Sequence, residues 1–146
     1  MMNHSEARTI AEAMWGTGGT QSRKTNRHGA FYFSCSGHGG FVIDALAFTA
    51  AERKALEPWA KPEPYELYIW GKHRRLWHPL RRLTLKFSQL ARPTKGLYYV
   101  FEEDCDWALV WVYTKIRDKG HTWTDEKVEA YAKEVHARWH TKKETA

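Results

Sequence analysis

The chain has 146 residues and a net charge of +6, and 42% of its residues are apolar, with eight Trp among them. This length and composition predict one domain with a single core and exclude an intrinsically disordered chain. No apolar run approaches 18 residues, and the first 13 residues lack the apolar segment of a signal peptide. The two Cys lie 70 residues apart. We therefore expect a cytoplasmic protein with reduced thiols and no membrane partner.

The N-terminal third predicts a short helix, a loop and a β-hairpin. Apolar residues between 10 and 14 indicate a helix that ends at Trp15-Gly16. The segment 16–29 is glycine-rich, polar and basic, but it lacks the Gly-Lys-Ser/Thr ending of a phosphate-binding loop, so we interpret it as a flexible loop. The runs 30–36 and 41–44 predict two strands, with Gly37-His38-Gly39-Gly40 as the turn between them.

The middle of the chain predicts one helix and three further strands. Thr49 is expected to cap the helix, and Glu52, three residues later, completes a capping box. Pro58 ends this helix near Glu57. Alternating or β-rich sequence predicts strands at 65–71, 83–88 and 97–101.

The C-terminal third predicts two helices. The segment 102–116 keeps an apolar helical face after an acidic start, which favours a helix, although its run WALVWVY also suits a buried strand. Thr124 is expected to cap the last helix, and residues 141–146 are expected to fray. Together these elements predict a single α+β domain over residues 1–146, in which two or three helices cover one face of a mostly antiparallel sheet of four or five strands.

Positive charge is concentrated in one segment. From Leu67 to Phe101 there are eight Lys or Arg and no Asp or Glu, so the rest of the chain has a net charge of −2. Segregated charge of this kind attracts a polyanion or an acidic protein surface, and the interleaved Trp provide rings for stacking or anchoring. The alternative is a solvated basic face without a partner. The predicted binding residues are Lys72, Arg74, Arg75, Trp77, Arg81, Arg82 and Lys86.

Cys35 and His38 have the spacing of two zinc ligands. A structural zinc site needs four ligands, usually as two close pairs, and Cys105 has no Cys or His within four residues to form the second pair. We therefore predict no metal and no other cofactor. A Cys35–His38 nucleophilic pair is disfavoured because residues three apart across a turn often point away from each other. The favoured interpretation is a structural turn.

Four carboxylates lie within five residues, from Glu102 to Asp106. Glu102, Glu103 and Asp104 could act with His38 as a small metal-dependent nuclease or hydrolase, in which a carboxylate-bound metal lies beside basic residues. They could equally cap a helix and pair with the basic segment, and we favour that interpretation. The enzyme would require His38 within about 4 Å of one of these carboxylates at the floor of a cleft.

Three short motifs of the chain are Trp15-Gly16, Ser36-Gly37-His38-Gly39-Gly40 after a strand, and the EEDCDWA segment at 102–108. Together they resemble a family of uncharacterised proteins from bacteriophages, prophages and plasmids. In that family a Trp-Gly near the start is followed by a Ser-His-Gly-Gly turn and later by Glu-Glu-Asp-Cys-x-Trp. The present chain differs by inserting Gly37. The family has no established activity, so the resemblance implies a genomic setting rather than a reaction.

That setting implies an accessory protein in the cytoplasm of a bacterial host. Small phage proteins of this kind often block a host defence complex at an interface, as anti-CRISPR proteins do. We therefore expect a non-enzymatic inhibitor that binds a host protein or ribonucleoprotein complex with an acidic or nucleic-acid-bearing surface. The alternatives are the nuclease or hydrolase described above and a nucleic-acid-binding accessory protein. The basic charge argues against an acidic DNA mimic.

Overall fold

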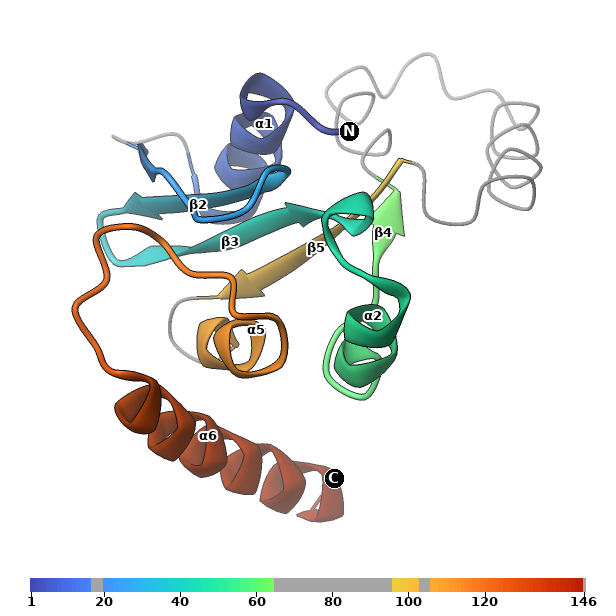
Figure 1. The fold of residues 1–146 in the computed structure, drawn as a ribbon, viewed down its shortest axis with the longest axis vertical. Coiled ribbons are helices and arrows are strands. Elements are labelled where there is room, and N and C mark those ends of the chain that lie inside the picture. The colour runs from blue at the N-terminus through green and yellow to red at the C-terminus, as the bar shows by residue number, and fades with distance from the viewer. Residues whose placement is uncertain (17–19, 65–95, 103–105, 146) are drawn as a thin grey trace.

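The fold is a five-stranded sheet with helices on both faces (Figure 1). The computed structural model describes residues 1–16, 20–64, 96–102 and 106–145. The strand order is β1-β2-β3-β5-β4, and each neighbouring pair is antiparallel. The strands are β1 Gln21–Arg23, β2 Ala30–Cys35, β3 His38–Asp44, β4 Glu63–Pro64 and β5 Leu97–Glu102. The predicted α+β class and antiparallel sheet are confirmed.

Two of the helices begin at capping boxes. Helix α1, His4–Trp15, starts earlier than predicted because the Asn3 side chain accepts a hydrogen bond from the Glu6 N–H at 2.9 Å, and the Glu6 carboxylate accepts one from the Asn3 N–H at 2.8 Å. Helix α2, Ala50–Leu56, has the predicted Thr49–Glu52 box, with bonds of 2.8 and 3.2 Å. Each box satisfies backbone N–H groups that have no partner within the helix.

The two C-terminal helices are α5, Trp107–Thr114, and α6, Asp125–Thr145. The acidic start predicted for α5 is wrong at Glu102, which ends strand β5 instead. The WALVWVY run is helical as predicted, and its residues from Trp107 to Trp111 are all buried. The helix α6 continues through Thr145, into the segment that was expected to fray. The described part of the chain thus has four α-helices, and they cover both faces of the sheet. The prediction that helices cover one face only is wrong, because successive apolar residues of the central strands point to opposite faces.

The β2–β3 turn is shorter than predicted. Cys35 pairs with His38, so the turn is Ser36-Gly37, and the remaining residues assigned to it, 38–40, belong to β3. The positive φ of 92° at Gly37 suits a tight hairpin turn. Gly40 lies between Phe33 and Glu102 in the sheet, and a Cβ there would lie 2.0 Å from the Phe101 carbonyl oxygen. Glycine at this position therefore allows β5 to pair closely.

Side-chain alternation divides the buried residues into two clusters. One cluster lies under α1 and includes Met2, Ile10, Phe33, Val42 and Tyr98. The other lies against α2, α5 and α6 and includes Tyr32, Phe41, Ile43, Tyr99 and Phe101 from the sheet. Successive residues of a strand point to opposite faces, which is why neighbours such as Val42 and Ile43 enter different clusters. The sheet is therefore buried on both sides at its centre.

Some predictions concern segments for which no structure is described. The strands expected at 65–71 and 83–88 lie outside the described residues.

None of the described helices is long and apolar enough to cross a membrane.

Candidate functional site

The predicted site residues divide into two groups. The basic binding residues, together with Glu103 and Asp104, lie outside the described residues. His38 and Glu102 are described, and both are exposed. His38 opens β3 opposite Cys35, whereas Glu102 ends β5 opposite Gly40. The two side chains are therefore at the same end of the sheet, in diagonal rather than direct pairing.

The described part of the chain shows no contact between His38 and Glu102 of the kind that the enzyme alternative requires. They make no ion pair there, and neither side chain lines the cavities described below. The described residues also contain no group of three His, Cys, Asp or Glu side chains that could hold a metal.

The motifs that resemble phage proteins meet at this end of the sheet. The Cys35 thiol lies 3.6 Å from the Trp15 carbonyl oxygen, so the end of α1 contacts the β2–β3 hairpin. Gly40 pairs with Glu102, which begins the EEDC motif. These contacts join α1, the hairpin and β5.

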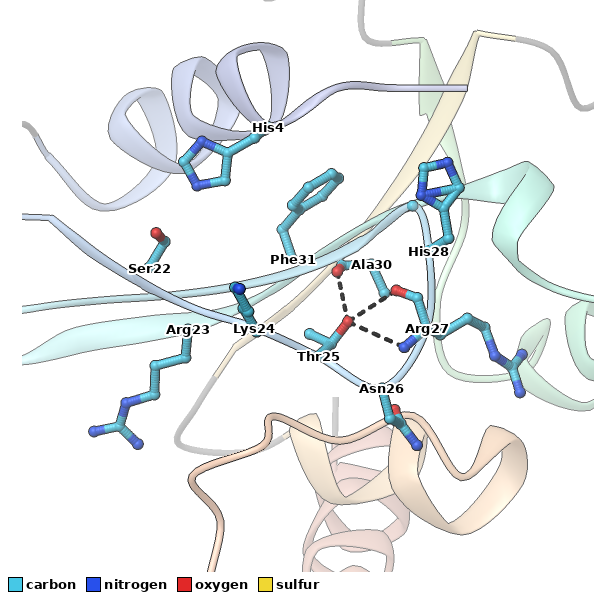
Figure 2. Close-up of a pocket in the computed structure, with 11 residues that line it drawn as sticks. His4, Ser22, Arg23, Lys24, Thr25, Asn26, Arg27, His28, Ala30 and Phe31 are labelled. Carbon is cyan, nitrogen blue, oxygen red and sulfur yellow. Dashed lines mark hydrogen bonds between the residues drawn. The ribbon is translucent and has the colours of Figure 1, made fainter.

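A second region of interest is a surface cleft of about 490 Å³ beside β1 and the β1–β2 connection (Figure 2). Its lining contains no Asp or Glu, whereas five of its residues are Lys, Arg or His. The lining consists of His4 and the continuous segment Ser22–Phe31. This cationic cleft lies in the region that the sequence analysis treats as a flexible loop without a phosphate site.

The segment is clamped to the connection between α5 and α6. The Asn26 N–H donates to the Arg117 carbonyl at 3.1 Å, and the Arg117 N–H donates to Asn26 Oδ1 at 2.9 Å. Asn26 Nδ2 donates to the Lys115 carbonyl at 2.8 Å, and the Lys119 N–H donates to the Lys24 carbonyl at 2.7 Å. The predicted loop 16–29 therefore contains an edge strand and a fixed turn.

Thr25 closes this turn from within. Its hydroxyl lies 2.7 Å from the Ala30 carbonyl oxygen and 2.9 Å from that of Arg27, and it accepts a bond from the Arg27 N–H at 3.3 Å (Figure 2). Gly29 has a φ of 80°, and a Cβ at this position would lie 2.5 Å from the Met1 sulfur, so the turn requires glycine here. The shape of the cleft is thus set by local bonds as well as by the clamp.

Both arginines of the cleft form ion pairs within the protein. Arg27 binds both carboxylate oxygens of Glu52 at 2.9 and 2.8 Å, and it also donates to the Ala47 and Thr114 carbonyl oxygens. Arg23 lies 3.5 Å from the buried Asp118 carboxylate. Their charges are therefore offset within the protein, and they serve mainly to hold the segment in place.

Lys24 and the two histidines form the unpaired part of the cleft. Lys24, His28 and His4 are exposed, and none has an ion pair with a described residue. Ser22 pairs with Phe33 and Arg23 with Tyr32, so the next residue, Lys24, falls opposite Phe31 on the α1 side of the sheet. Figure 2 shows His4, Phe31 and His28 on one side of the segment and Arg23 on the other.

An aromatic platform completes the cleft. The half-buried Phe31 ring lies 5.8 Å from the His4 ring in an edge-to-face arrangement, and His4 also lies 5.6 Å from Phe33. Phe31 and Phe33 stack at 6.5 Å. This site is not among the predicted ones, although the alternation of Phe31 and Phe33 with Tyr32 indicates that one face of β2 carries two aromatic rings.

His121 occupies a tryptophan cluster behind the clamp. Its ring lies 4.7, 5.1 and 5.6 Å from the rings of Trp107, Trp111 and Trp123. Burial lowers the pKa of His121, the nearby Asp118 opposes this, and Arg23 adds to the lowering. The neutral ring accepts a bond at Nδ1 from the Trp123 N–H at 3.3 Å, so the cluster stabilises the α5–α6 connection.

A further cavity of about 420 Å³ lies between α5 and α6. It is lined mainly by Leu109, Val112, Tyr113 and two Ala, with Glu129 and Lys133 at its polar side. The lining is mainly apolar, and Glu129 and Lys133 are exposed charged residues of α6.

Comparisons with protein-family models, with curated proteins and with solved structures find no match to this chain. The resemblance to phage proteins therefore stays a prediction, and function is argued from the chain's own residues.

Proposed function

We propose that this chain is a non-enzymatic accessory protein of a phage or other mobile element, which binds and inhibits a host defence complex, as anti-CRISPR proteins do. The observation that carries the proposal is the segregation of charge: Leu67 to Phe101 holds eight Lys or Arg and no acidic residue, within a chain of net charge +6. A field of one sign raises the rate at which an oppositely charged surface is found. The partner is a host complex with an acidic or nucleic-acid-bearing surface.

The described fold supports binding over the hydrolase alternative. His38 and Glu102 are exposed residues at the end of a sheet, and neither lines a described cavity. The central strand β3 is buried on both faces, which gives a rigid base from which binding segments can extend.

The proposed interface has two parts with different kinetic roles. Exposed cations speed association, and salt weakens their effect over a screening length of about 8 Å at physiological ionic strength. Trp77 is proposed as an anchor that slows dissociation once it is buried in the partner. Replacing Arg81 should therefore change mainly the association rate and its salt dependence, whereas Trp77→Ala should change mainly the dissociation rate.

The experiment is an affinity capture from a bacterial host lysate, with and without nuclease treatment. The protein is compared with a variant in which Arg81, Arg82 and Lys86 are replaced by Glu. A control variant makes the same charge change at three exposed positions elsewhere, Lys54, Lys61 and Lys119. We expect a protein partner that survives nuclease treatment, is lost with the first variant and is kept by the control.

Two outcomes would contradict the proposal. A folded variant at Arg81, Arg82 and Lys86 that captures the same partner would remove the basic segment from the interface. If the protein without substitutions no longer captures a partner once the lysate is treated with nuclease, the nucleic-acid-binding alternative is favoured. Melting curves of all three proteins separate loss of binding from loss of folding, because exposed charges contribute little to stability.

A further inference from the structure

We propose that the cationic cleft beside β1 binds single-stranded nucleic acid, with a backbone phosphate between Lys24 and His28 and a base against Phe31. The cleft is distinct in sequence from the basic segment at 72–95, so the inference goes beyond the function proposed above. The carrying observation is a preformed concave surface in which the unpaired Lys24, the exposed His28 and an aromatic platform face the same side.

The charge of the cleft favours a phosphate. Its lining has no carboxylate, and its two arginines are paired with Glu52 and Asp118. Lys24 and His28 are exposed and keep their donors for a ligand. A lysine ammonium is a compact charge that binds phosphate oxygens without a fixed geometry, which suits a sequence-independent backbone contact.

The aromatic part favours an unpaired base. The Phe31 ring is half-buried, with its edge contact to His4 at 5.8 Å, and it lies on the same side of the strand as Lys24. Bases stack on aromatic rings whatever their identity, but in a duplex they are stacked on each other and unavailable to such a ring. The combination of Lys24 and Phe31 therefore selects a single strand over a duplex.

The clamp makes the cleft ready for binding. Four hydrogen bonds of 2.7 to 3.1 Å tie residues 24–26 to the α5–α6 connection. A surface that is fixed before the ligand arrives loses less conformational entropy on binding. The volume of about 490 Å³ is in the range of small-ligand sites, which suits one nucleotide of a passing strand.

The test measures binding of the full chain to a fluorescent 12-nucleotide RNA and to the same sequence as a duplex. The protein also carries the substitutions Arg81→Glu, Arg82→Glu and Lys86→Glu, so that the basic segment contributes little to nucleic-acid binding. Lys24→Gln should weaken single-strand binding about 5-fold and should reduce the salt slope by about one. Phe31→Leu should weaken it about 10-fold with the salt slope unchanged, because leucine keeps the packing but removes the stacking ring.

Lys54→Gln is the matched control. Lys54 is equally exposed but lies on α2, on the opposite face of the sheet, and its replacement should leave affinity and salt slope unchanged (Figure 1). Ultraviolet cross-linking of a 5-bromouracil strand gives a direct readout. We expect an adduct on the peptide that contains Phe31.

The inference is overturned if the duplex binds as tightly as the single strand, if Lys24→Gln and Lys54→Gln behave alike, or if adducts form only outside residues 4 and 22–31. Displacement of the strand by polyglutamate at equal charge concentration would instead assign the cleft to an acidic protein segment. None of these results changes the capture experiment above, since that experiment leaves Lys24, His28 and Phe31 unchanged.

Discussion

Replacing Gly40 by alanine tests how closely β3 and β5 are packed. Gly40 is paired on both sides, with Phe33 in β2 and Glu102 in β5, and its φ is 149°. A Cβ at this position would lie 2.0 Å from the Phe101 carbonyl oxygen and 2.9 Å from its carbonyl carbon. These neighbours are backbone atoms, so the overlap can be relieved only by moving a strand.

The expected cost has two parts. An alanine in this backbone conformation stores about 1–3 kcal/mol of strain. Forcing extra volume into a packed interior adds about 1–3 kcal/mol. We therefore expect Gly40→Ala to lower the free energy of unfolding by about 2–6 kcal/mol, a large share of the roughly 5–15 kcal/mol typical of a domain. The melting temperature should fall by about 2–4 °C per kcal/mol for a chain of this size.

The matched control is Gly37→Ala in the hairpin turn. Gly37 also has a positive φ, 92°, but no heavy atom lies within 4 Å of its Cβ position. It therefore carries the strain without the overlap. Urea unfolding of both variants, followed by circular dichroism, measures the difference. If Gly40→Ala is as stable as Gly37→Ala within about 0.5 kcal/mol, the close approach of β5 is refuted.

Two further predictions concern the clamp. Arg27→Ala should lower the free energy of unfolding by about 2–3 kcal/mol, because it removes the ion pair of Glu52 and the side-chain donor to two carbonyl groups; an unchanged urea midpoint would contradict this role. The pKa of His121 is lowered from 6.5, so the unfolded chain binds more protons and stability should fall as the pH drops below about 7. His121→Gln should reduce the loss of stability between pH 7 and pH 5. If the free energy of unfolding depends on pH in the same way for both proteins, the assigned role of His121 is contradicted.

The sequence predicted correctly those helices and strands that are determined by residues close to one another in the chain. The Thr49–Glu52 capping box, the helix end near Pro58 and the strand at 97–101 are all found in the structure. Each depends on residues a few positions apart, so a short window contains the whole physical reason. The prediction of an α+β domain followed from adding such elements.

The location of turns and helix starts was less predictable. The glycines at 37–40 indicated a turn, but only the pairing of Cys35 with His38 places it at Ser36-Gly37. Glu102 has the charge of a helix start, yet its backbone pairs with Gly40. In both cases a competing strand partner decided the outcome, and that partner is distant in sequence.

The amino-acid sequence by itself determined the separation of charge, the class of fold and the elements with local caps. The tertiary structure alone decided that the polar segment around Asn26 is a fixed turn beside the edge strand β1 and not a flexible loop, because its partners at Lys115 and Arg117 lie about 90 residues away. It also decided that Lys24 and Phe31 share a face, since strand register and not composition sets which side chains meet.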